Sequence, residues 1–252
     1  MKSFIINTTT HNYFLFIFIL GFIYFSCESP QLLSVEGPED IRPIILLTKD
    51  LNNQTGKIKC LISVTIKDKD GQNVTIANCN IYVNDSLMSL PDWSLFGAKR
   101  YYYKSTIPVV TNSLYTFKII FSDGEIYEAW IRTPAVDILS MTIPEKHKRN
   151  TALNVQWLPK DYMYPQKIIV QYWNIEDGFS SDDQVIQGIP YPYIGEYTLN
   201  KAFLRYTNKS DEVLEETRIV LVSETTGELD KNFLDGGSVK SQFRIYQNLE
   251  VY

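Results

Sequence analysis

The residues of this 252-residue chain best suited to covalent chemistry are its three cysteines, Cys27, Cys60 and Cys79. A two-residue turn at Lys69-Asp70 would place Cys60 and Cys79 opposite each other in a β-hairpin, where a disulfide would stabilise the fold by about 3 kcal/mol. A three-residue turn would offset them, so a disulfide and two free buried thiols both stay open. Metal binding is disfavoured, because no histidine or further cysteine lies near this pair in the sequence.

Side chains suited to acid–base or nucleophilic catalysis are few, and we expect no catalytic site. The chain has two histidines, and His147 lies in a basic polar turn that predicts a solvated side chain. A Ser-His-Asp or Cys-His nucleophile needs an ordered histidine. Carboxylates in one turn-rich segment could act as an acid–base pair or ligate calcium, but nothing fixes their separation. These are Glu176, Asp177, Asp182 and Asp183.

A second acidic pair, Asp68 and Asp70, directly precedes Gly71 and allows the same two interpretations. An EF-hand calcium loop carries a third acidic or amide ligand before its glycine, and this segment lacks it. We therefore expect ordinary solvated turns at both acidic clusters, with no metal and no cofactor.

Aromatic side chains that interrupt the strand periodicity are the candidates for ligand contact. Consecutive tyrosines in a strand must send at least one ring to the outer face, because successive side chains alternate. Exposed rings beside polar groups suit stacking on sugars or contact with a partner protein. The competing interpretation is that the rings fill the space between two sandwiches or cover edge strands. The candidates are Trp93, Phe96, Tyr101, Tyr102, Tyr103, Tyr191 and Tyr193.

An apolar segment near the N-terminus predicts export. Residues 13–25 (YFLFIFILGFIYF) carry no charge, follow a segment that contains Lys2 and precede the small residue Ser26. A helix of that length covers roughly 20 Å, short of the ~30 Å hydrocarbon core of a bilayer. These features are typical of a signal peptide over residues 1–26. A short transmembrane anchor is the alternative.

Cys27 directly follows this segment, and the arrangement resembles the lipobox of bacterial lipoproteins in its looser Bacteroidota form, with Tyr24 and Phe25 where small or aliphatic residues are usual. The resemblance implies cleavage before Cys27 and its acylation, which makes the lipid bilayer an expected partner. Each buried methylene contributes about 0.8 kcal/mol, so several acyl chains hold a protein firmly on a membrane. With lipid on Cys27, the other two cysteines are left as an even pair. Ordinary secretion with an unpaired Cys27 is the alternative.

Alternating apolar residues predict that the mature chain is all-β. Ile58, Ile62 and Ile66 share one face of a strand, and Asp123-Gly124 between two aromatic runs is a strong hairpin signal. Several short strands at regular spacing favour two tandem β-sandwich domains. The predicted divisions are a lipoprotein signal peptide at 1–26, a flexible tether at 27–45, an N-terminal sandwich at 46–136 and a second sandwich at 137–252.

Two segments are less regular. The strand predicted over residues 73–83 changes its apolar parity near Ala77-Asn78, which a β-bulge would explain. Residues 199–216 are the one place where a helix could form.

The second half of the chain has a strand, then a tryptophan-bearing strand that ends at a proline (ALNVQWLP), then the strand KIIVQYW. This order resembles the opening of a fibronectin type III domain, a sandwich of the immunoglobulin-like kind. In that resemblance Trp157 is the core tryptophan of the second strand and Tyr172 is the aromatic residue of the third.

A broader resemblance spans roughly residues 57–141. The segments VTIKDKDGQNVTIANCNIYV and SLYTFKIIFSDGEIYEAWIRTPAVDILSM resemble lipoproteins of unknown function in Bacteroidota, often encoded beside TonB-dependent outer-membrane receptors. That group has no established activity to transfer. The resemblance implies a lipid-anchored location at the outer membrane, on its periplasmic or its surface face.

Charge and composition narrow the function further. The net charge is −5 and the sequence shows no basic patch, so nucleic-acid binding is disfavoured. We expect a membrane-anchored, non-enzymatic lipoprotein that binds a partner at the cell envelope, either an outer-membrane receptor or a polysaccharide. One alternative is a fimbrial or adhesin subunit completed by a donor strand. A carboxylate-based hydrolase is the remote alternative.

Overall fold

The protein is all-β in a computed structural model, and its described part holds strands β1 to β20 with two short 3₁₀ helices, η1 (Pro38–Asp40) and η2 (Lys201–Leu204). Within this part, no helix has the length and apolar character needed to cross a membrane. The described residues are 32–33, 37–76, 79–90, 94–95, 98–99, 102–160, 165–173, 183–189, 195–204 and 216–252.

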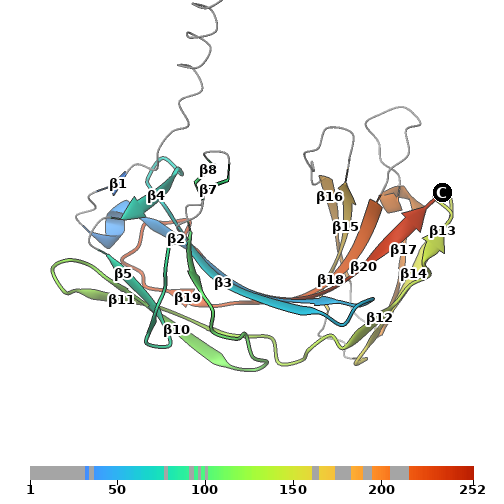
Figure 1. The fold of residues 1–252 in the computed structure, drawn as a ribbon, viewed down its shortest axis with the longest axis horizontal. Helices are drawn as coiled ribbons and strands as arrows, with labels where there is room; N and C mark the ends of the chain where they lie inside the picture. The colour runs from blue at the N-terminus through green and yellow to red at the C-terminus, as the bar shows by residue number, and fades with distance from the viewer. Residues whose placement is uncertain are drawn as a thin grey trace, which may run out of the picture.

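A long curved sheet of ten strands runs through the molecule (Figure 1). Its main path has the order β1-β4-β3-β2-β20-β18-β15-β16, while β9 pairs with β3 and β13 pairs with β20. The strands are β1 (Leu32–Leu33), β2 (Arg42–Asn52), β3 (Ile58–Lys67), β4 (Asn73–Ile76), β9 (Tyr103–Ser105), β13 (Lys146–His147), β15 (Lys167–Trp173), β16 (Asp183–Gly188), β18 (Glu216–Thr226) and β20 (Ser238–Val251).

Two smaller sheets pack against one side of the long sheet, one toward each end, and lie below it in Figure 1. The five-stranded sheet has the order β19-β11-β10-β5-β6 and the three-stranded sheet has the order β12-β14-β17. Their strands are β5 (Asn80–Val83), β6 (Ser86–Leu87), β10 (Leu114–Ile120), β11 (Ile126–Arg132), β19 (Glu228–Leu229), β12 (Ser140–Thr142), β14 (Leu153–Leu158) and β17 (Glu196–Leu199). A separate pair joins β7 (Ser94–Leu95) to β8 (Ala98–Lys99).

Each smaller sheet encloses a hydrophobic core with its part of the long sheet, so the prediction of β-sandwiches is confirmed. Phe117 is fully buried in the first core, and Trp157 is buried in the second. Fully burying a side chain such as Phe or Ile contributes about 1.5–3 kcal/mol. Strand β20 contributes to both cores, because Phe243 packs in the first and Ile245 and Leu249 pack in the second.

The two sandwiches are interlocked by the C-terminal hairpin. Strand β20 pairs in parallel with β2 from Ile44 to Asn52, and antiparallel with β18. Between β18 and β20 the chain returns to the first sandwich, where β19 pairs with β11 and Phe233 enters the first core. The segment after residue 136, assigned from sequence to the second sandwich alone, therefore supplies strands to both.

Two details differ from the sequence-based expectation. Strand β2 begins at Arg42 and Ile45 is buried, so residues 42–45 belong to the sheet and not to a tether. The strand expected over residues 73–83 is two strands in different sheets, because β4 pairs with β3 and β5 pairs with β10. The change of parity marks this change of sheet; residues 77–78, where the bulge was expected, lie outside the described residues.

Two further local predictions concern a hairpin and a segment that could form a helix. Strands β10 and β11 form the expected hairpin, whose turn places Gly124 at φ +88. In the segment 199–216, where a helix could form, residues 201–204 form η2, while residues 205–215 lie outside the described part.

Candidate functional site

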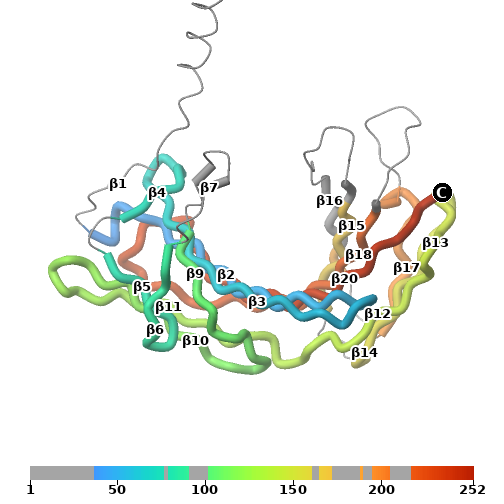
Figure 2. Tube along the Cα trace, viewed as in Figure 1, coloured from blue at the N-terminus to red at the C-terminus, as the bar shows by residue number. Residues whose placement is uncertain are grey.

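The side of the long sheet that faces away from both smaller sheets is concave (Figures 1 and 2). Side chains alternate across a strand, and the buried residues Phe243 and Ile245 fix which side of β20 faces the cores. The even-numbered side chains of β20 therefore point to the concave side, together with their register partners on neighbouring strands. We call this side the concave face.

An ion pair at the centre of the concave face joins β2 to β20. Asp50 lies opposite Arg244 on one side and Lys59 on the other. The Arg244 guanidinium donates from Nε to Asp50 Oδ1 at 2.6 Å and from Nη2 to Oδ2 at 2.7 Å. Such bidentate pairs fix orientation as well as adding energy. The contact holds the Arg244 side chain in place where the two sandwiches meet.

Glu224 on β18 is the second acid of the concave face. It accepts hydrogen bonds from Lys167 Nζ at 2.9 Å and Gln242 Nε2 at 2.6 Å, and its own N–H donates to Gln166 Oε1 at 2.7 Å. Burial raises the pKa of the Glu224 carboxyl, but the hydrogen bonds from Lys167 and Gln242 outweigh burial and leave that pKa below its ordinary value. Glu224 is therefore ionised at neutral pH.

Arg218 is held on the same face by two neighbours on β20. Its guanidinium lies over the Tyr246 ring, 4.5 Å from the centroid, and its Nε donates to Asn248 Oδ1 at 3.1 Å. A cation–π contact of this kind favours a fixed guanidinium position. The arginine is thus preorganised.

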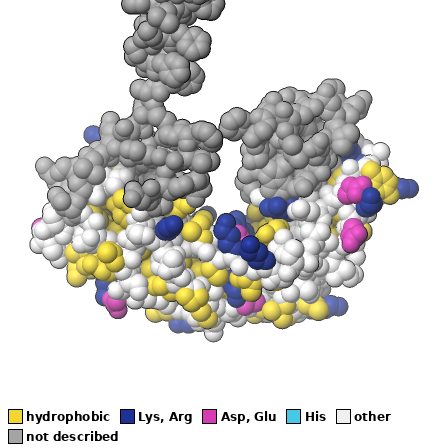
Figure 3. All heavy atoms as spheres, in the orientation of Figure 1, with side chains coloured by type: hydrophobic (Ala, Val, Ile, Leu, Met, Phe, Trp, Pro, Cys, Tyr) yellow, Lys and Arg dark blue, Asp and Glu magenta, His cyan; other side chains and the backbone are white. Residues whose placement is uncertain are grey.

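Basic side chains outnumber acidic ones on the concave face. Lys59, Lys104 and Lys240 are exposed there, and none pairs with a carboxylate within the described part of the chain. Figure 3 shows lysine and arginine side chains gathered near the centre of the molecule. We call the set the basic face; it consists of Lys59, Lys104, Lys167, Arg218, Lys240 and Arg244.

The basic face is not evident from the sequence. Its six residues are spread from position 59 to position 244 and form no basic run. The only local signal is the alternation of side chains in each strand. It places each of the six residues on the side of its strand that faces away from the core.

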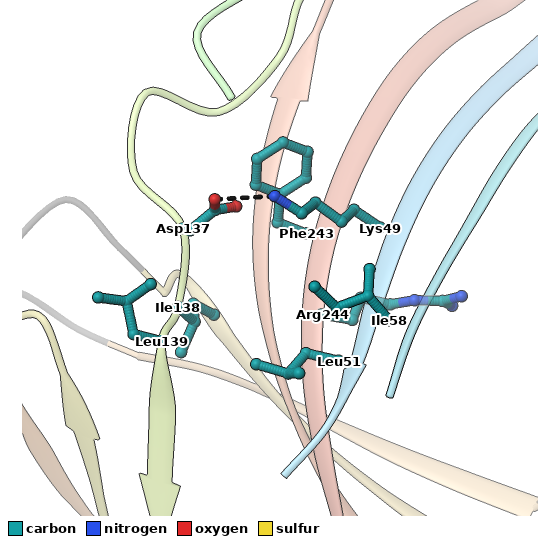
Figure 4. A pocket seen from close by; sticks show the side chains of 8 residues that line it. All are labelled: Lys49, Leu51, Ile58, Asp137, Ile138, Leu139, Phe243 and Arg244. Atoms are coloured by element: carbon teal, nitrogen blue, oxygen red, sulfur yellow. Dashed lines mark hydrogen bonds and ion pairs between the residues drawn. The ribbon is translucent and has the colours of Figure 1, made fainter. Parts of the chain in front are cut away.

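A small cavity of about 70 Å³ lies on the opposite side, where the two sandwiches meet (Figure 4). Lys49 forms an ion pair of 2.8 Å with Asp137, and its ammonium lies 5.2 Å from the centroid of the Phe243 ring. Asp137 also accepts a hydrogen bond of 2.6 Å from Thr111. Sites for organic ligands usually have about 300 Å³ or more, so this cavity is too small for such a ligand. Its ion pair instead holds the segment between β11 and β12 against the long sheet.

The aromatic candidates from the sequence are only partly described. Tyr103 is 6% exposed and packs in the first core, so it is corrected from a ligand contact to a core residue. The reason is its register opposite Val64, whose side chain faces the core. Tyr102 is half-buried, and its contact with a ligand stays a prediction. Outside the described residues lie Trp93, Phe96, Tyr101, Tyr191 and Tyr193.

Trp130 is an exposed aromatic residue that was not among the candidates from the sequence. Trp130 is 44% exposed on the outer face of the five-stranded sheet, opposite Thr116. Its neighbours Ala129 and Ile131 are buried, so the alternation EAWIR was the available signal.

The candidate disulfide does not form in this structure. Cys60 and Cys79 are both free, and Cys60 lies exposed on β3. After Ile76 the chain leaves the hairpin for the other sheet, which carries Cys79 away from the position opposite Cys60. Burial raises the pKa of the Cys79 thiol to about 12. Cys27 lies outside the described residues.

The acid and histidine candidates have structural roles where they are described. Asp68 Oδ1 accepts hydrogen bonds from the N–H groups of Asp70 and Gln72 at 2.9 and 2.8 Å, which closes the β3–β4 turn. The Nε2 atom of His147 lies 3.1 Å from the Thr151 hydroxyl. No group of three His, Cys, Asp or Glu residues suited to a metal ion occurs in the described ranges. Asp183 begins β16, and Glu176, Asp177 and Asp182 lie outside these ranges.

No protein-family model matches the chain, and no curated protein is significantly similar to it. The function therefore has to be inferred from the residues and geometry of this chain.

Proposed function

We propose that the chain is a non-enzymatic lipoprotein, anchored in the outer membrane of the cell envelope, that binds a partner protein or a glycan on its concave face. The observation that carries this proposal is the continuous sheet shared by both cores, whose concave side presents exposed charged residues. Acyl chains on Cys27 would hold the protein on the membrane.

Rigidity supports a binding role for this sheet. Strand β20 is paired with β2 from Ser238 to Tyr246 and with β18 from Lys240 to Leu249, and the Asp50–Arg244 pair links β20 to β2. A preorganised surface loses little conformational entropy when a ligand binds, which leaves more of the contact energy as affinity.

The anchor is supported by the sequence before the fold. Residues 13–25, Ser26 and Cys27 have the order of a lipoprotein signal peptide and its acylated cysteine. The second sandwich sets the three strands β12-β14-β17 against β20-β18-β15-β16, with Trp157 on the middle strand of the smaller sheet. This arrangement supports the resemblance to a fibronectin III-like module, a kind of domain common in cell-surface proteins.

Cell fractionation of the Cys27→Ala variant tests the anchor. The unaltered protein should be recovered with membranes, and the variant should be released to the soluble fraction because its acyl chains are missing. Cys60→Ala, which removes an exposed thiol from β3, is the matched control and should stay with membranes. Recovery of Cys27→Ala with membranes at the level of the unaltered protein would refute the lipid anchor.

A further inference from the structure

We propose that the ligand of the basic face is an acidic polysaccharide, a glycan chain that carries carboxylate or sulfate groups. The inference rests on the proposed function and names the chemical class of its ligand. It is carried by the charge, the spacing and the shape of the concave face.

Charge complementarity is the first argument. The six residues of the basic face and the two acids that pair with members of it, Asp50 and Glu224, together carry a formal charge of +4, in a chain whose net charge is −5. Toward the ends of the sheet this side also carries Arg42 and Lys67, the ion pair of Lys146 with Glu250, and Glu216 at the start of β18. A positive surface on an otherwise acidic protein selects anionic ligands and steers them to that surface.

The distribution of the cations is the second argument. From Lys59 on β3 to Lys167 on β15 the sheet takes four strand steps, and at 4.7–4.9 Å per step this is roughly 19 Å. From Lys104 on β9 to Lys240 on β20 it takes three steps, roughly 14 Å. The cations thus form a track across the strands, which suits a chain with repeated anionic groups better than a single small anion.

The basic face contains arginines held in fixed positions and lysines that are exposed. Arg218 and Arg244 are fixed by Tyr246 and Asp50, so their guanidinium groups are preorganised, and arginine matches carboxylate and sulfate-like oxygens by its geometry. Lys59, Lys104 and Lys240 are exposed, so their ammonium groups can follow anions at variable positions along a chain. Amide side chains among them, such as Gln242 and Asn248, supply hydrogen bonds of the kind that sugar hydroxyls accept and donate.

The shape of the face disfavours a bilayer as the occupant. The long sheet curves so that its two ends rise on the side of the basic face (Figure 2). A flat layer of anionic lipid headgroups would meet the ends before it reached Arg244 at the centre. A narrow polymer chain can follow the curved sheet between them.

Aromatic chemistry disfavours single-stranded nucleic acid. Proteins that bind single strands stack bases on exposed aromatic rings. On the central strands β2, β3, β18 and β20, the ring on the concave side is Tyr246, and Arg218 lies over it. A glycan needs no such platform when its anions are paired.

Binding of polygalacturonate to the full chain in non-ionic detergent tests the proposal, with neutral dextran as the comparison polymer. The Lys59→Gln/Lys240→Gln double variant should raise the Kd for polygalacturonate about tenfold, from the loss of two exposed charge contacts. The matched control Lys148→Gln/Lys231→Gln removes two exposed lysines outside the basic face and should change the Kd less than about twofold. Added salt should weaken binding, because exposed charges are screened.

Three results of the binding experiment would overturn the acidic polysaccharide as the ligand. Equal binding of dextran and polygalacturonate, with no effect of the double variant, would overturn the acidic polysaccharide while the proposed function stands. Tighter binding of a single-stranded oligonucleotide than of polygalacturonate would replace the ligand class by nucleic acid. An absence of binding to sulfated and carboxylated polymers alike would also overturn the inference. The Cys27→Ala fractionation reports on the anchor independently of all three.

Discussion

Glu224 and Asp50 show how single residues shape the concave face. Each carboxylate holds a basic side chain in place, Lys167 in one case and Arg244 in the other, without covering the exposed lysines beside them. The acids therefore position two of the cations and leave the three exposed lysines unpaired with a carboxylate in the described part of the chain. Asp50 pairs with Arg244 across a sequence separation of 194, so this contact could not be predicted from local sequence.

Glu224→Gln should remove a pH-dependent part of the stability. The folded-state pKa of Glu224 lies below its ordinary value of 4.5, so ionised Glu224 contributes stability above that pH, and the contribution is lost as pH falls through the folded-state pKa. The variant should be less stable than the unaltered protein near neutral pH, and the difference should shrink in acid. Urea unfolding at about pH 7 and about pH 3 measures it. The exposed Glu145→Gln is the control, and a Glu224→Gln difference that did not change with pH would contradict this role.

Among the elements, the β18–β20 hairpin has the largest structural role. Strand β20 contributes to both cores, β18 contributes to the second, and the connection between them brings β19 against β11. Gly227 lies at the crossing point, where the backbone of β11 comes close. A Cβ atom at this position would lie 2.2 Å from the carbonyl oxygen of Trp130 and 2.7 Å from Ile131 Cβ.

Gly227→Ala should destabilise the fold by roughly 1–3 kcal/mol, because the added methyl group overlaps backbone that cannot move without displacing β11. Gly188→Ala on β16 is the matched control, since a Cβ there meets no heavy atom within 4 Å. Equilibrium urea unfolding of both variants gives the comparison. Equal stabilities for the two variants would show that β11 is not held as tightly as described.

Local elements could be predicted from the sequence and long-range pairing could not. The β10–β11 hairpin follows from Asp123-Gly124 between two alternating runs, which is information within nineteen residues, from Leu114 to Arg132. The parallel pairing of β2 with β20 depends on residues at opposite ends of the chain and carries no local signal. The change of sheet between β4 and β5 was visible as a parity change, but the sequence did not say which partner each half would take.

At the scale of the whole molecule, these pairings produce the concave face that we propose as the binding surface. Two cores alone would give two small modules, each with its own edges. Because one sheet spans both cores, the residues that face away from the cores form a single concave face with an excess of positive charge (Figures 2 and 3). They come from six strands, β9, β3, β2, β20, β18 and β15. The sequence predicted the all-β class and an anchored binding protein; the surface proposed for binding emerged only from the fold.

The central claim is that ligand binds on the concave face, and lysine acylation footprinting of the full chain tests it most directly. With polygalacturonate bound, the rate of acylation should fall several-fold at Lys59, Lys104 and Lys240 and stay unchanged at Lys148 and Lys231, which lie outside the basic face. Uniform slowing at all five lysines, or slowing only at Lys148 and Lys231, would contradict the assignment of the concave face as the binding surface.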